Sequence, residues 1–114
     1  MDSNSTMKKI NLVPYNIKGL NEENKPIDVP YNVKESIQAI IFHPALKLDG
    51  RQLLLRGKLS EKLDAAGDEI LLEDADYASV KSSFELVQGF GKNDLELVRR
   101  VLEAESVEVE VKKK

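Results

Sequence analysis

The sequence predicts an α+β fold in which about four helices cover a small, mostly antiparallel sheet. Segments of alternating apolar and polar residues lie near both ends of the chain, and capped stretches with helical spacing lie between them. No repeat of about 20–50 residues is present, which argues against a solenoid. We expect the sheet to combine an N-terminal hairpin with a C-terminal strand, because a lone terminal strand would leave its backbone groups unpaired.

The length of 114 residues suits one domain with a modest core. We expect a single α+β domain over residues 8–111. A disordered lead over residues 1–7 precedes it, and a disordered basic tail over residues 112–114 follows it. Because the lead is polar, translation starting at Met7 is an alternative to a start at Met1.

Two short segments near the N-terminus have the alternation of strands. Residues 8–13 place Ile10 and Leu12 on one face, and residues 27–29 alternate in the same way. The segment between them, residues 19–26, is rich in turn-forming residues. We therefore expect these two strands to form an antiparallel hairpin with a mobile tip.

The first two helices are predicted from their caps. Asn32 precedes a helix that ends near Phe42, and Asp49 precedes a helix over residues 50–66. Gly57 weakens the second helix, so a bend or a division into two shorter helices is an alternative. The expected apolar faces are Val33, Ile37, Ile40 and Ile41 in the first helix, and Leu55, Leu59 and Leu63 in the second.

The second half of the chain predicts an extended segment and two more helices. Residues 69–73 are too few for a helix, Asp74 is placed to cap a third helix ending at Gly89, and Asn93 to cap a fourth. The expected apolar faces are Tyr77, Val80, Phe84 and Val87 in the third helix, and Leu95, Val98 and Leu102, widened by Val101, in the fourth.

Residues 107–111 alternate strictly and predict the terminal strand. We expect its valines to pack on the helices and Glu108 and Glu110 to face solvent. From the helix faces, the residues expected to be buried are Ile37, Ile41, Leu63, Val80, Phe84 and Leu102.

Composition excludes several classes of function. The net charge is -3, so no overall basic field attracts nucleic acid or anionic membranes. The chain has no cysteine, which removes disulfides, thiolate metal sites and cysteine nucleophiles. No apolar run approaches the roughly 20 residues that span a bilayer. We expect a soluble protein of the cytoplasm with no cofactor and no membrane contact.

Candidate catalytic residues are few. His43 is the sole histidine and lies at a helix end, where a structural role is expected over a catalytic one. No Gly-x-Ser-x-Gly turn accompanies it. An acidic cluster offers an alternative, a metal-dependent hydrolase, although acids also stabilise helix N-termini. That cluster consists of Asp68, Glu73, Asp74 and Asp76.

The most distinctive stretch is the glycine-rich loop over residues 89–94. It lacks the spacing of a phosphate-binding loop, and Asp94 would repel an anion. Phe90 either packs on the end of the third helix or is an exposed anchor for a partner. We take Phe90, Lys92 and Asn93 as the candidate interaction residues, because loops on rigid scaffolds often carry recognition.

A basic set on the second predicted helix supports another function, a nucleic-acid-associated regulator. Acidic residues interrupt this set, which favours a solvated face instead. The residues that would form the nucleic-acid face are Arg51, Arg56, Lys58 and Lys62.

The layout of residues 8–105 resembles small accessory proteins of tailed bacteriophages and prophages. The resemblance lies in residues 33–37 (VKESI), residues 48–59 and residues 68–77. It implies a phage-encoded, non-enzymatic protein, and it transfers no functional residue. We therefore expect a protein–protein interaction module that acts in virion assembly or on a host protein. Its partner is expected to be a phage or host protein, or a second copy of the chain, in the host cytoplasm or the virion.

Overall fold

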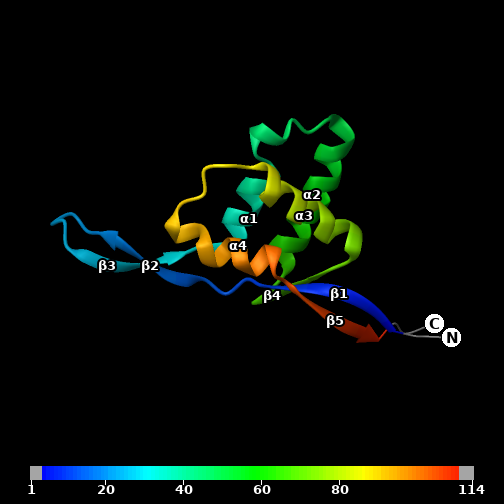
Figure 1. Cartoon of the computed structure of the whole chain (residues 1–114), viewed down its shortest axis with the longest axis horizontal. Coiled ribbons are helices and arrows are strands. Elements are labelled where there is room, and N and C mark those ends of the chain that lie inside the picture. The colour runs from blue at the N-terminus through cyan, green and yellow to red at the C-terminus, as the bar shows by residue number, and fades with distance from the viewer. Residues whose placement is uncertain (1–3, 111–114) are drawn as a thin grey trace.

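The structure is a computed structural model and describes residues 4–110 (Figure 1). Its strands are β1 (Asn4–Asn11), β2 (Tyr15–Leu20), β3 (Pro26–Tyr31), β4 (Glu69–Leu72) and β5 (Glu105–Glu110). Its helices are α1 (Val33–Ile41), α2 (Gly50–Ala65), α3 (Asp74–Leu86) and α4 (Leu95–Leu102), with short 3₁₀ turns η1 (Pro44–Leu46) and η2 (Lys92–Asp94).

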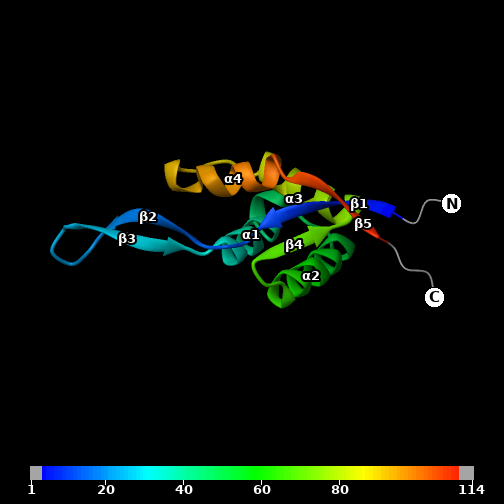
Figure 2. The ribbon, with the colours of Figure 1, turned by 90° about the horizontal axis from the view of Figure 1, so that it is seen from below.

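The predicted α+β class is confirmed: the four helices accompany two antiparallel sheets in the described part of the chain. The helices lie on one side of the three-stranded sheet, as the two perpendicular views show (Figures 1 and 2). No helix of the described residues covers the other side of that sheet. Apolar residues are needed on the covered side only, which explains the alternation within β1 and β4.

The three-stranded sheet has the order β4-β1-β5, with both pairs antiparallel. β1 pairs with β4 through residues 8–11 and with β5 through residues 4–9. The expected hairpin between residues 8–13 and 27–29 is therefore wrong. β1 finds both its partners in distant parts of the sequence, and Ile10 of β1 is buried in the same core cluster as Ile70 and Leu72 of β4.

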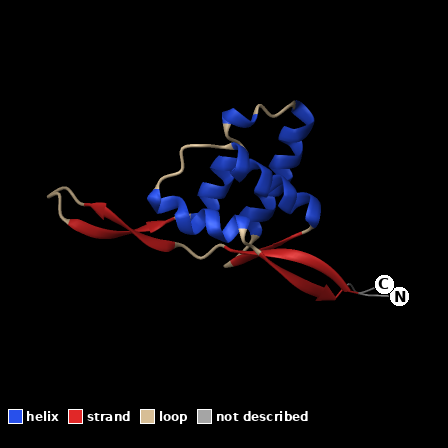
Figure 3. Ribbon diagram, in the orientation of Figure 1, coloured by secondary structure: helices blue, strands red, loops and turns tan. Residues whose placement is uncertain are grey.

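The hairpin that does form is β2–β3, a separate two-stranded sheet (Figure 3). It projects from the helical body at one end of the molecule, and β1 and β5 extend side by side past the helices at the opposite end (Figure 1). No side chain in β2 or β3 is fully buried. The radius of gyration is 16.2 Å, whereas a compact domain of this length has about 13 Å. The projecting ribbons thus give the molecule an elongated shape.

The predicted caps of the first two helices are confirmed. The Asn32 side chain accepts a hydrogen bond from the backbone of Glu35, at 3.1 Å. Asp49 and Gln52 form a reciprocal capping box, with bonds of 2.8 and 3.0 Å. α2 continues without a break through Gly57, so the alternative of two shorter helices is wrong.

Replacing Gly57 by alanine should stabilise the protein. A Cβ built at this position meets no atom within 4 Å, so the methyl group fits without displacement. Alanine lowers the conformational entropy of the unfolded chain and favours the helix, which should add about 0.5–1 kcal/mol to the free energy of unfolding. Urea unfolding of the parent and of Gly57→Ala measures this difference. A loss of stability would contradict the open surroundings of this glycine.

The predicted caps of the other two helices are wrong. Glu73 occupies the N-cap position of α3, and Asp74 is already within the helix. The η2 turn precedes α4, so the N-cap is Asp94 and not Asn93. The Asp94 carboxylate accepts the Gly91 N–H at 2.8 Å, which closes the loop before the helix. A carboxylate beside unpaired helix N–H groups is favourable at either position, which is why sequence patterns alone do not separate them.

Most of the predicted core is buried, but α4 is rotated from its expected orientation. Leu97 and Val101 are its buried residues, whereas Leu95 is 60% exposed and Leu102 only partly buried. Leu55 of α2 is also exposed, contrary to its predicted role. The predicted core residues confirmed as buried are Ile37, Ile41, Leu63, Val80 and Phe84.

The terminal strand forms and Glu108 is exposed, as predicted, but the orientation predicted for the valines is wrong for Val107. Val107 pairs with Met7, and Glu105 pairs with Lys9 on the same face. Ile10 lies on the opposite face, the one that packs on the helices. The register of β5 on β1 therefore decides which face of the sheet Val107 occupies, because a shift of one residue would move every β5 side chain to the opposite face. The side chains of Val109 and Val111 lie outside the described residues.

The start of β1 lies earlier than the expected domain boundary at residue 8. Residues 4–7, predicted as part of a disordered lead, pair with residues 107–110 of β5. Pairing satisfies the backbone groups of both segments, which neither could do alone. The predicted tail over residues 112–114 lies outside the described residues.

Candidate functional site

Two stacked tyrosines fix the base of the β2–β3 hairpin to the helical body. The rings of Tyr15 and Tyr31 have centroids 4.7 Å apart and planes that differ by 12°. The Tyr15 hydroxyl donates to the carbonyl of Asn93 at 2.8 Å and accepts the Leu97 N–H at 3.2 Å. These bonds hold the start of β2 beside the start of α4.

Arg100 adds a second connection between the same elements. Its guanidinium carbon lies 5.1 Å from the centroid of the Tyr15 ring, within the range of a cation–π interaction. The guanidinium donates to the carbonyls of Val13 and Asn11, at 2.6 and 3.2 Å, and to Glu96 at 2.9 Å. The linker between β1 and β2 is thereby held against α4.

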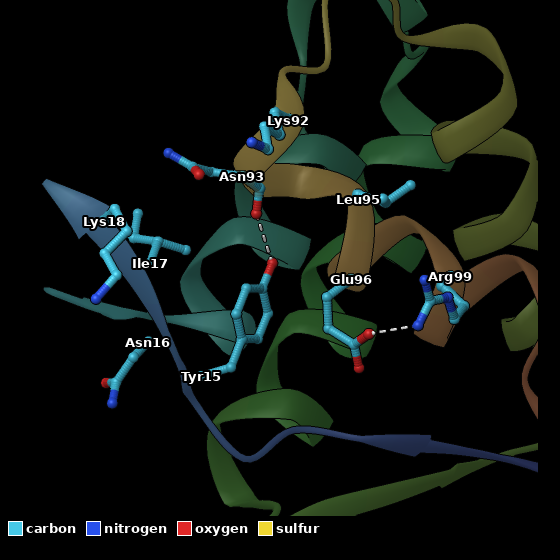
Figure 4. Close-up of a pocket in the computed structure, with 9 residues that line it drawn as sticks. All are labelled: Tyr15, Asn16, Ile17, Lys18, Lys92, Asn93, Leu95, Glu96 and Arg99. Atoms are coloured by element: carbon cyan, nitrogen blue, oxygen red, sulfur yellow. Dashed lines mark hydrogen bonds and ion pairs between the residues drawn. The ribbon is translucent and has the colours of Figure 1, made fainter. Parts of the chain in front are cut away.

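An open groove of about 580 Å³ lies between β2 and α4 (Figure 4). One wall consists of residues 15–18 of β2. The other consists of Lys92 and Asn93 of η2 with Leu95, Glu96 and Arg99 of α4. Tyr15 closes the groove at its base, where its ring reaches across to Asn93 (Figure 4). We call this feature the β2–α4 groove.

The β2–α4 groove carries more positive than negative charge. Lys18, Lys92 and Arg99 line it, against the single carboxylate of Glu96. Lys18 pairs with Asp28 at 2.6 Å and Arg99 pairs with Glu96 at 3.1 Å, but both pairs are solvent-exposed. Exposed pairs contribute little and exchange readily. Within the described part of the chain, Lys92 has no acidic group at ion-pair distance, so its charge is available to a ligand.

The structure separates the three interaction residues predicted from the glycine-rich loop. Lys92 and Asn93 line the β2–α4 groove. Phe90 instead stacks on Phe84, with centroids 5.7 Å apart, and is partly buried against the core. Gly89, with φ of +96°, provides the turn that brings Phe90 back. This geometry fits the packing role of Phe90, whose ring is partly buried by its contact with Phe84.

His43 has a structural hydrogen bond. Its Nδ1 accepts the backbone N–H of Ala45 at 3.0 Å and so caps the η1 turn. His43 lines a smaller hollow of about 280 Å³ together with Tyr31 and Phe90.

Stability should fall at alkaline pH because of Tyr31. Burial and the hydrogen bond that it donates to Asp94 raise its pKa to about 12. An unfolded tyrosine has a pKa of about 10. The stability that the neutral phenol of Tyr31 contributes is therefore fully present below about pH 10, and it is lost as the pH rises towards about 12. Burial also raises the pKa of Tyr15 and Tyr77, which act in the same direction.

Urea midpoints measured between pH 8 and pH 11 test this expectation. The parent should lose stability above about pH 10, and Tyr31→Phe should lose less over the same interval. An equal slope for both proteins would mean that Tyr31 does not titrate on unfolding.

The structure divides the basic residues of α2. The Arg56 guanidinium turns inward, donates to Ser83 Oγ, and is desolvated enough for burial to lower its pKa. Lys62 forms an ion pair with Asp76 at 2.6 Å, and that hydrogen bond raises the pKa of Lys62. Arg51 and Lys58 are exposed. Two of the four predicted contacts to nucleic acid are thus already engaged, and the nucleic-acid hypothesis gains no support from this arrangement.

The acidic cluster does not assemble a metal site in residues 4–110. No three acidic or histidine side chains in this range converge closely enough to ligate one ion. Asp68 ends the turn before β4, Glu73 and Asp74 begin α3, and Asp76 is paired with Lys62. The metal-dependent hydrolase alternative gains no support from these positions.

Sequence reasoning missed the β2 wall of the groove. Residues 15–18 alternate after Pro14, which is the signal of a second strand, but a proline is also the expected end of a first strand over residues 8–13. Arg99 and Glu96 could not be assigned to a site, because nothing in the sequence places α4 beside β2. The contact depends on the hydroxyl of Tyr15, which joins residues far apart in the chain.

In the described residues, no helix combines the length and apolar character needed to cross a membrane. Comparison with protein-family models, curated proteins and solved structures found no match to this chain.

Proposed function

We propose that this chain is a non-enzymatic protein–protein interaction module and that it binds its partner in the β2–α4 groove. Its resemblance to small accessory proteins of tailed phages supports a phage or host protein as that partner. The function would then be exerted in virion assembly or in the host cytoplasm.

The observation that carries the proposal is the uncovered hairpin. An isolated two-stranded hairpin is marginally stable in water, because it lacks a second layer to cover one face. Here the base is anchored by Tyr15 and Tyr31, while Ile27 is 39% and Leu20 is 66% exposed. A partner in the groove would supply further contacts to β2 and reduce the exposed area of the arm.

Site-specific photo-crosslinking tests this proposal. A photoreactive amino acid at position 95 lies in the groove, and the same amino acid at position 54 lies on α2. Leu95 is 60% and Leu54 is 72% exposed, so neither replacement disturbs the core. In a lysate of the cells in which the gene is naturally expressed, we expect a discrete protein adduct from position 95 and none from position 54.

The captured protein is then purified and its affinity measured against the parent and Lys92→Glu. Reversal of this charge should weaken binding by about tenfold, as for charged interface contacts of moderate strength. Lys58→Glu, an exposed residue of α2 outside the groove, is the matched control and should leave binding unchanged. Adducts from position 54 alone, identical adducts from both positions, or no adduct from position 95 would overturn the proposal.

A further inference from the structure

The two outer edges of the hairpin differ in their hydrogen-bonding capacity. The Asn21 N–H donates to the Lys25 carbonyl at 3.0 Å, and the register continues from Leu20 opposite Pro26. Hydrogen-bonded and non-hydrogen-bonded pairs alternate along an antiparallel ladder. Because residues 21 and 25 form a hydrogen-bonded pair, residues 20, 18 and 16 belong to non-hydrogen-bonded pairs. Their backbone N–H and C=O groups therefore point away from β3.

On β3 the corresponding outward positions are 26, 28 and 30. Pro26 and Pro30 occupy two of them and have no N–H to donate. Proline on an edge prevents another strand from adding there. The β3 edge is thus blocked, whereas Asn16, Lys18 and Leu20 leave the β2 edge capable of pairing.

The open β2 edge faces the β2–α4 groove. The groove is lined by residues 15–18 of β2 and by no residue of β3. It therefore lies on the side of β2 away from its partner strand, with η2 and α4 as the opposite wall (Figure 4). A segment paired with β2 would lie in this groove and contact α4 through its side chains.

The charges of the groove indicate the character of such a segment. Lys92 has no ion-pair partner within the described residues, and Lys18 and Arg99 hold only exposed ones. Ile17 and Leu95 add apolar surface to the lining. An extended segment with several carboxylates and an apolar residue would complement both features.

We infer that the partner binds by strand addition, as an extended acidic segment that pairs with the free edge of β2 within the β2–α4 groove. This inference rests on the proposed function and specifies how it is carried out. Main-chain hydrogen bonds to residues 16, 18 and 20 would provide affinity, and Lys92 and Arg99 would select for acidic side chains.

A second copy of the chain is a poorer occupant. Two-fold antiparallel pairing of β2 with β2 of another copy, centred on Lys18, would bring the two lysines together across the strands. Like charges directly opposite each other destabilise a strand pair. The register centred on Lys18 is therefore disfavoured for two copies, whereas an acidic segment in the same place would meet the lysine with opposite charge.

A capped peptide of about ten residues, alternating glutamate and threonine around one central isoleucine, is the probe. The measurements are its affinity by calorimetry and the hydrogen exchange of backbone amides by NMR. We expect slower exchange at Asn16, Lys18 and Leu20, and weaker binding as the salt concentration rises. The same peptide with lysine in place of glutamate should not bind.

Two changes isolate the main-chain contacts. N-methylation of alternate peptide amides removes their donors. Lys18→Pro removes one from the β2 edge without touching a bond to β3, and Lys18→Ala, which removes the same charge but keeps the N–H, is its control. N-methylation and Lys18→Pro should each weaken binding by about tenfold or more, the latter relative to Lys18→Ala. Because Lys18→Pro could disturb the hairpin, the methylated peptide on the parent protein provides an independent result.

Equal affinity of the methylated and unmethylated peptides, no binding of the acidic peptide, or protection confined to β4 or β5 would overturn strand addition. The proposed function fails separately. A partner crosslinked at position 95 that binds without protecting residues 16, 18 and 20 would retain the groove as the interaction site and eliminate only this mode of binding.

Discussion

Replacing Phe84 by alanine should lower the free energy of unfolding by about 3–5 kcal/mol, the range for buried phenylalanine. Phe84 is 3% exposed in α3 and packs with residues of the hydrophobic core. Its removal leaves a cavity that the surrounding helices cannot fully fill. Since small domains have about 5–15 kcal/mol in total, the variant should melt far below the parent, as urea or thermal unfolding would measure.

Phe90→Ala is the matched control for this substitution. It removes the same atoms from the other ring of the Phe84–Phe90 stack, but Phe90 is only partly buried. We expect a clearly smaller loss. Equal losses would mean that the stacking contact, and not the burial of Phe84, provides the stability. A Phe84→Ala variant that unfolds like the parent would contradict the packing of α3.

The second large effect is expected at Leu97. Leu97 is 0% exposed, so truncation to alanine should cost about 2–5 kcal/mol. Leu95, two residues earlier in the same helix, is 60% exposed, and Leu95→Ala should change stability by less than about 0.5 kcal/mol. Comparing the two variants shows directly which face of α4 packs against the core. A larger loss of stability for Leu95→Ala than for Leu97→Ala would contradict this orientation and support the one expected from the sequence.

Local patterns in the sequence predicted the elements and much of the core. Asn32 and Asp49 could be recognised as caps because a cap depends on bonds to the next three residues only. Ile37, Ile41 and Leu63 could be recognised as buried because apolar residues at helical spacing lie on one face of whatever helix they form.

Strand pairing could not be predicted in the same way. The alternation favours a hairpin between residues 8–13 and residues 27–29, whereas β1 pairs with β4 and β5. Alternation identifies a strand but carries no information about its partner. Val107 shows the same limit, because the face that it occupies depends on the register with β1.

The candidate site contains both features that the sequence indicates and features that depend on the tertiary structure. The glycine-rich loop made Lys92 and Asn93 recognisable as candidates, and the structure places both in the β2–α4 groove. Only tertiary structure decided that Phe90 packs inward, and that Tyr15 brings β2 to α4. The sequence by itself determined the α+β class, the helices and most of their buried faces, because these follow from interactions within a few residues. The partners of the strands, the rotation of α4 and the groove depend on contacts between distant residues, which no local pattern records.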